Sequence, residues 1–207
     1  MDMGAFVTVA TTFFFILNPF SSLSLFISVT NRLDRGSMGT YANKAVLVAA
    51  ILLVVFVLIG PDLMRGFGVT MDSFSVAGGI VLFLMSMELI FGLKLTNMDD
   101  EKGAPWAIIA TPILTGPGMI TTAILLSDTH GMTVVLAAGI LALLFTWITL
   151  RSATRIMKFI GEQTVGILSR IIGLLITAMS IELVFKGAAA WFSNHAAQIV
   201  LGILTSM

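Results

Sequence analysis

The sequence predicts an all-α membrane protein with six transmembrane helices, and three observations support this fold class. The chain has 207 residues, 57% of them hydrophobic and only 11% charged, with a mean hydropathy of +1.05. The charged residues gather in short clusters, which leave long apolar runs between them. About 20 apolar residues cross a hydrocarbon layer about 30 Å thick, so these runs are long enough to be membrane spans. This composition excludes an ordinary soluble domain.

The polar clusters divide the chain into its expected elements. They read NRLDRGS, PDLMRG, KLTNMDDEKG, SDTHG and RSATRIMKFIGEQ, and we interpret each as a loop. A last apolar run, AAQIVLGILTSM, is too short for another span, so we expect it at the membrane interface or against the bundle. Residues 1–207 thus form a single predicted transmembrane domain, with spans at residues 5–30, 42–60, 74–93, 105–127, 132–150 and 167–191.

The distribution of Lys and Arg predicts the orientation, because cytoplasmic loops retain these residues. With six spans and the N-terminus outside, the cytoplasmic side would hold Arg32, Arg35, Lys44, Lys94, Lys102, Arg151, Arg155, Lys158 and Arg170, and the outer side only Arg65 and Lys186. We therefore predict a multi-pass protein of the cytoplasmic membrane with both termini outside.

A weak internal repeat relates the third and sixth spans. At an offset of 94 residues, GIVLFLMSMELIFG at 79–92 aligns with GLLITAMSIELVFK at 173–186, and both contain a Ser-x-Glu pair. If each half has three spans, the halves enter the membrane from opposite sides. Residues 1–93 and 105–191 would then be two inverted three-helix repeats, an arrangement widespread among secondary transporters.

Helices 1 and 4 are predicted to be broken near the midplane, at corresponding places in the two halves. Pro19 cannot donate a backbone hydrogen bond, and Asn18 before it is steered away from helical angles. In the fourth span Gly116, Pro117 and Gly118 predict a loop between two half-helices, the second beginning at Met119. The freed carbonyls of residues 14–17 must face protein or a polar cavity, because lipid cannot satisfy them.

The two breaks predict a binding site for a small polar solute. The N-terminus of a half-helix favours a carboxylate. A zwitterion could place its carboxylate there and its ammonium against carbonyls and the Asn18 oxygen. The alternative is that prolines and small residues only kink the helices and allow close packing. The candidate substrate-binding residues are Asn18, Pro19, Ser21, Ser22, Thr115, Gly116, Pro117, Gly118, Thr121 and Thr122.

Two glutamates lie inside apolar helices and are candidates for ion coupling. Glu88 and Glu182 could load and release H⁺ or Na⁺ during a transport cycle, since a carboxylate in a membrane span is costly and commonly functional. The alternative is a structural role, in which each reaches the headgroups or pairs with a nearby cation such as Lys186. No other cofactor and no metal site are expected.

Three stretches resemble the MarC family of six-span membrane proteins: FILNPFSSLSLFISVT, GGIVLFLMSMELIFG and ATPILTGPGMITT. That family includes small neutral amino acid transporters of the SnatA type. The resemblance covers essentially the whole chain. It implies transport of solutes such as glycine or alanine driven by an ion gradient. The residues of this chain that match the family's motifs are Asn18 and Pro19 in the first span, and Gly116, Pro117 and Gly118 in the fourth.

Other function classes have less support from the sequence. An intramembrane enzyme would need a Ser–His pair, two membrane aspartates or an HExxH motif. His130 and His195 lie near interfaces and no Asp lies within a span, so we expect no enzymatic activity. A channel, or an exporter of another small metabolite or cation, remains an alternative. The expected partners are a small-molecule substrate and the lipid bilayer. A net charge of zero argues against nucleic acid, and the oligomeric state stays open.

Overall fold

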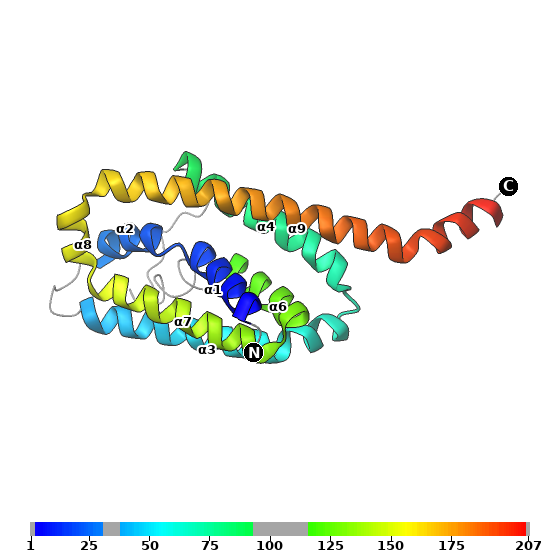
Figure 1. Ribbon diagram of the computed structural model, residues 1–207, viewed down its shortest axis with the longest axis horizontal. Helices are drawn as coiled ribbons and strands as arrows, with labels where there is room; N and C mark the ends of the chain where they lie inside the picture. The colour runs from blue at the N-terminus through cyan, green and yellow to red at the C-terminus, as the bar shows by residue number, and fades with distance from the viewer. Residues whose placement is uncertain (1–2, 31–37, 93–115, 206–207) are drawn as a thin grey trace.

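A computed structural model describes residues 3–30, 38–92 and 116–205, and the regular structure in these ranges is helical. In Figure 1 the long helices run along one axis of the molecule, and one short helix crosses an end of the bundle. The helices are α1 (Met3–Leu17), α2 (Pro19–Thr30), α3 (Met38–Gly66), α4 (Met71–Phe91), α6 (Pro117–His130), α7 (Met132–Arg151), α8 (Ala153–Ile160) and α9 (Glu162–Thr205).

The all-helical membrane fold is confirmed. Within the described ranges, 5 segments are long and apolar enough to cross a membrane, namely Met3–Leu23, Met38–Gly66, Met71–Phe91, Met132–Arg151 and Glu162–Ala196. The predicted fourth span, 105–127, lies partly outside the described residues, and its remainder falls in α6. With 14 residues, α6 is about 21 Å long and cannot cross a membrane alone. The sixth span and the inverted relation of the halves therefore stay predictions.

Three expectations from the sequence were wrong. The PDLMRG cluster continues α3 instead of forming a loop, because Gly60 and Pro61 are buried and Gly60 packs against Ile124 of α6. The RSATRIMKFIGEQ cluster contains α8, since its apolar residues repeat at helical spacing. The last apolar run continues α9 to Thr205, so its expected packing against the bundle is wrong, and its expected position at the membrane interface stays a prediction. At 44 residues α9 is about 66 Å long, so its C-terminal end extends past the other helices (Figure 1).

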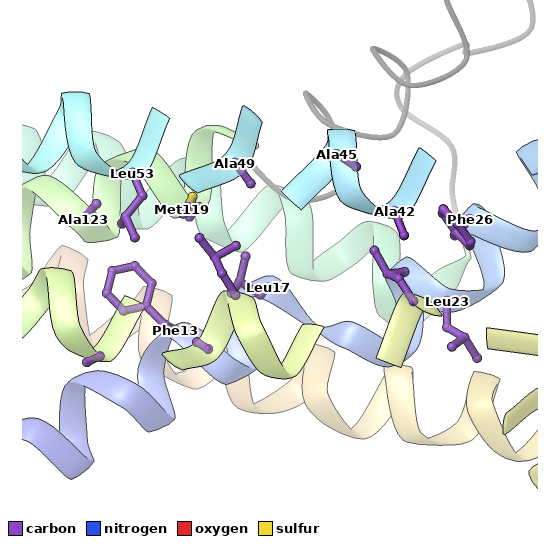
Figure 2. Packing of buried hydrophobic residues seen from close by; sticks show 14 of the residues in the cluster. Phe13, Leu17, Leu23, Phe26, Ala42, Ala45, Ala49, Leu53, Met119 and Ala123 are labelled. Atoms are coloured by element: carbon purple, nitrogen blue, oxygen red, sulfur yellow. The ribbon is translucent and has the colours of Figure 1, made fainter. Parts of the chain in front are cut away.

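The largest buried cluster lies between α1, α2, α3, α6 and α7 (Figure 2). α3 contributes a stripe of small residues, Ala42, Ala45 and Ala49, spaced about one helical turn apart. Without larger side chains on this face, neighbouring backbones can approach closely, as is common between helices in membranes. The opposite face of α3 exposes apolar side chains such as Leu47 and Ile51, as expected where lipid replaces water.

The two segments of the sequence repeat pack against each other in α4 and α9. A Cβ added to Gly79 would lie 2.7 Å from the carbonyl oxygen of Ser180, and one added to Gly173 would lie 3.4 Å from the carbonyl oxygen of Ser86. The Thr177 hydroxyl donates to the Ser86 hydroxyl at 2.7 Å. Equivalent positions of the repeat thus make reciprocal contacts, and the two helices run antiparallel (Figure 1).

This close approach predicts that Gly79→Ala destabilises the bundle. The new methyl would meet the backbone of α9, which cannot move aside as the end of a flexible side chain can, so we expect a loss of about 1–3 kcal/mol. The matched control is Gly166→Ala, also in a helix, where an added Cβ would have no neighbour within 4 Å. Thermal unfolding in detergent checks both variants. Equal melting temperatures for the two would contradict the packing described here.

Candidate functional site

The predicted break in the first span is present at Asn18. α1 ends at Leu17 and α2 begins at Pro19. Asn18 between them has φ 37°, a left-handed conformation that Asn adopts more readily than most residues other than glycine. Because Pro19 has no N–H and its fixed φ suits the first position of a helix, the Asn-Pro pair both ends one helix and starts the next.

Asn18 and Ser22 satisfy most of the backbone groups that this break exposes. The Asn18 N–H donates to the carbonyls of Phe14 and Phe15, at 3.2 and 3.1 Å. The Ser22 hydroxyl donates to the Leu17 carbonyl at 3.1 Å, and the Asn18 Oδ1 accepts from the Ser21 N–H at 3.2 Å. Three of the four carbonyls predicted to be freed are therefore bonded within the protein. The Asn18 oxygen is an N-cap of α2, so it is already engaged.

The second predicted break is described only from Gly116 onward. α6 begins at Pro117, two residues earlier than the expected Met119, with Gly116 as its N-cap residue. No side chain caps its first turn, where the Met119 N–H turns back to the Gly116 carbonyl at 3.0 Å. α6 is about two thirds as long as α7, to which Gly131 joins it, so α6 begins partway along the bundle. There Gly116, Gly118 and Met119 are buried, and Pro117 is exposed. Thr115 and the first half-helix fall outside the described residues.

The break at Asn18 and the start of α6 adjoin the same buried cluster, which contains Leu82 of α4. Phe15, Ile16 and Phe20, which flank Asn18, pack against the buried cluster of Leu82, Ile172 and Ile176. A Cβ added to Gly118, in the first turn of α6, would lie 2.7 Å from Leu82 Cδ2. On the other side, Leu17 and Met119 belong to one buried cluster (Figure 2). The unwound segment of the first span and the start of α6 are therefore neighbours.

Two buried polar side-chain atoms, one at the Asn18 break and one in the second turn of α6, have no hydrogen-bond partner among the described residues. Within the part of the chain that the structure describes, the buried side-chain atoms without a hydrogen bond are the Asn18 Nδ2 and the Thr122 Oγ1. Asn18 and Thr122 are each 3% exposed. An unpaired buried polar group costs about 1–3 kcal/mol, so two of them beside two helix breaks indicate a place for a polar ligand.

The remaining predicted site residues have mixed surroundings. Pro19 begins α2, and Ser21 is half-buried and uses its N–H for the Asn18 cap. Thr121 is buried because its Cγ2 packs directly on Gly78 of α4. Ser22 is buried and bonded to the Leu17 carbonyl. These residues shape and support the break, whereas Asn18 and Thr122 retain polar atoms for a ligand.

The two glutamates have different environments. The Glu182 carboxylate forms an ion pair with Lys186 at 3.2 Å, and the two side chains are 61% and 71% exposed. Glu88 is half-exposed in the last two turns of α4 and makes an interaction of its own. Neither belongs to a group of three His, Cys, Asp or Glu that could hold a metal ion, and the described ranges contain no such group. Their role in ion coupling stays a prediction.

Sequence reasoning missed the residues that support the site from α4 and α9. Leu82 and Gly78 contact α6 directly, and Thr177 bonds to Ser86 across the two helices. Leu82 lies among many similar residues in an apolar helix, so nothing in the sequence distinguishes it. Thr177 could have been found, because it lies one turn before Ser180 in the repeated segment.

Comparison with known proteins identifies the family. Residues 3–192 match the model of the MarC family integral membrane proteins. A UPF0056 membrane protein of Methanocaldococcus jannaschii is 33% identical, over 90% of this chain and 97% of that protein. Proteins named in the same way from Aquifex aeolicus and Buchnera aphidicola are 30% and 26% identical, over 83% and 93% of this chain and 86% and 100% of theirs. No solved structure matches. The chain therefore belongs to the MarC family of integral membrane proteins.

Proposed function

We propose that this chain is a secondary transporter of small neutral amino acids, such as glycine or alanine, across the cytoplasmic membrane. The observation that carries the proposal is a pair of buried polar atoms without a hydrogen-bond partner among the described residues, the Asn18 Nδ2 at the break of the first span and the Thr122 Oγ1 in α6. Broken helices that meet inside a bundle are a recurrent way to build a solute site in secondary transporters.

The chemistry of the breaks favours a carboxylate. Because the Asn18 oxygen caps α2, the side chain offers its NH₂ group, which is a donor. The start of α6 adds the Gly118 N–H group and the positive end of a helix dipole, since Pro117 has no N–H and the N–H groups of Met119 and Ile120 donate to the Gly116 carbonyl. The Thr122 hydroxyl can donate as well. These donors suit the carboxylate of an amino acid. The sequence had predicted that the Asn18 side chain contacts the ammonium group of the solute, whereas we now propose that it contacts the carboxylate.

The neutral character of the site limits the solute. Asn18, Ser22, Thr121 and Thr122 are the buried polar residues near the breaks, and none brings a charge. A solute with a net charge would remain uncompensated there, at high cost. A zwitterion is neutral overall, and its ammonium can use carbonyl oxygens of an unwound segment. Small side chains fit best because Gly78 and Gly118 hold α6 tightly against α4.

The reciprocal contact of α4 and α9 supports the proposed inverted repeat. Two halves related by an axis in the membrane plane would bring equivalent residues together in this way, as Gly79 with Ser180 and Gly173 with Ser86. Inverted halves commonly allow a site to open to each side of the membrane in turn. An ion gradient would supply the driving force, with Glu88 as the candidate coupling residue.

Replacing Thr122 by Val tests the role of its hydroxyl. The change is close to isosteric and removes a buried polar atom without a partner, so we expect an unchanged or higher melting temperature. Uptake of labelled glycine or alanine into proteoliposomes should fall about tenfold, because a hydrogen bond to the carboxylate is lost. The control is Thr146→Val in α7, equally buried, whose hydroxyl bonds to its own helix at 2.9 Å. Full uptake by Thr122→Val would mean that this hydroxyl does not bind the solute.

Two substitutions separate the capping role of Asn18 from solute binding. Asn18→Gly keeps the positive φ at a cost of only a few tenths of a kcal/mol for the lost cap. Asn18→Asp keeps the capping oxygen but replaces the NH₂ donor by a second acceptor. We expect both variants to insert and fold, and uptake to fall about ten- to hundred-fold in each. Wild-type uptake in both would mean that Asn18 only caps α2.

The glutamates give a paired test of ion coupling. Glu182→Gln should leave uptake and its ion dependence unchanged, because an exposed ion pair contributes only about 0–1 kcal/mol. Glu88→Gln should weaken the response of uptake to an imposed proton or sodium gradient. Gradient-driven uptake that is identical in wild type and Glu88→Gln would rule out coupling through this residue. Transport of another solute, with no transport of any neutral amino acid, would contradict the proposed substrate class.

A further inference from the structure

α8 lies across one end of the bundle, between the end of α7 and the start of α9 (Figure 1). Corners at Ser152 and Gly161 set its direction. Gly161 has φ 85° and ψ 152°, a conformation essentially restricted to glycine. On one face Ala153 is buried and Ile156 and Met157 pack against the main buried cluster. Because α7 and α9 both cross the membrane, α8 runs along its surface.

The outer face of α8 combines two cations with a large apolar side chain. Arg155 and Lys158 are exposed and lie one turn apart, and Phe159 is 94% exposed. In the described ranges neither cation forms an ion pair. Glu162 follows Lys158 by four residues, but the Gly161 corner separates them. By contrast, Arg151 is held at 3.5 Å from the Asn43 oxygen and 5.5 Å from the centre of the Trp147 ring.

The two ends of the described bundle differ in charge. The end with α8 carries Lys44, Arg151, Arg155, Lys158 and Arg170, with Glu88 and Glu162 as its acids. The opposite end carries Asp62, Asp72, Asp128 and Glu182, with only Arg65 and Lys186 as cations, and each of these cations is paired with an acid of its own helix. Among the described residues, α8 therefore places two cations that form no ion pair beside an exposed aromatic ring.

We propose that the outer face of α8 binds anionic phospholipid headgroups of the leaflet at this end, which is the predicted cytoplasmic side. Arg155 and Lys158 contact the lipid phosphates, and Phe159 inserts at the boundary between headgroups and acyl chains. Short amphipathic helices with this combination bind membrane surfaces through apolar burial together with attraction to anionic lipid. This surface is separate from the solute site, so the proposal does not depend on the transported solute.

A single spin label at position 159 tests the proposal, and the absence of native cysteine makes the probe unambiguous. Labelled Phe159→Cys is placed in nanodiscs of phosphatidylcholine, with or without phosphatidylglycerol. Accessibility to oxygen and to a water-soluble nickel chelate gives the ratio of membrane-embedded to water-exposed label. We expect the embedded form to dominate with phosphatidylglycerol. Adding Arg155→Gln and Lys158→Gln should lower the ratio on the order of 30-fold, since each basic residue near an anionic surface contributes about a factor of five.

Matched controls come from the opposite end of the bundle. Phe67→Cys reports on a phenylalanine that is 73% exposed, and Arg65→Gln removes a cation that is paired with Asp62. Neither control should respond to phosphatidylglycerol. A label at 159 that stays in water in both lipids would overturn the proposal. So would one that is embedded to the same degree without anionic lipid or without the two cations, because apolar burial alone would then account for the contact.

Discussion

The rest of the proposed site depends on one constraint, that backbone polar groups in a membrane must be satisfied without water. The first span breaks at Asn18, and this residue closes one helix with its N–H and opens the next with its side-chain oxygen. Ser22 takes the carbonyl that remains at Leu17. After these bonds the Asn18 NH₂ group remains buried without a hydrogen-bond partner in the part of the chain that the structure describes. The bonds that satisfy the backbone groups at the break therefore also determine that the Asn18 Nδ2 is the polar atom that can bind a ligand.

The neighbours of the break hold this arrangement in place. Gly118 brings the start of α6 against Leu82, and the residues flanking Asn18 pack against the cluster to which Leu82 belongs. Leu82 lies in α4, whose close contact with α9 depends on Gly79 and Gly173. Glycines at these positions let α4 and α9 approach closely, so their packing helps to position Leu82, against which the start of α6 lies. Stability and binding are thus linked through one helix pair.

Local signals in the sequence were sufficient for the spans that the structure describes and for the break at Asn18, whereas the predicted fourth span and its break stay predictions. A proline inside an apolar helix usually kinks or ends the helix. The break at Asn18 and Pro19 is present where the sequence predicted it. The role of the Asn18 side chain could not be read in the same way, because its oxygen and its NH₂ group differ only in which neighbours they reach. α8 was missed because a cluster of charged residues between two apolar runs is typical of a loop, although Ala153, Ile156 and Met157 have helical spacing. The partners of α6 depend on contacts between distant segments, which no local pattern encodes.

The central claim is that the Asn18 NH₂ group binds the carboxylate of the solute, and a distance measurement in the membrane tests it most directly. Solid-state NMR can measure the dipolar coupling between ¹⁵N-labelled asparagine side chains and glycine labelled with ¹³C at its carboxyl group. We expect one coupled asparagine signal, with a nitrogen-to-carbon distance of about 3.5–4 Å, as a direct hydrogen bond requires. This signal should disappear in Asn18→Asp. Bound glycine without coupling to any asparagine side chain would contradict the account.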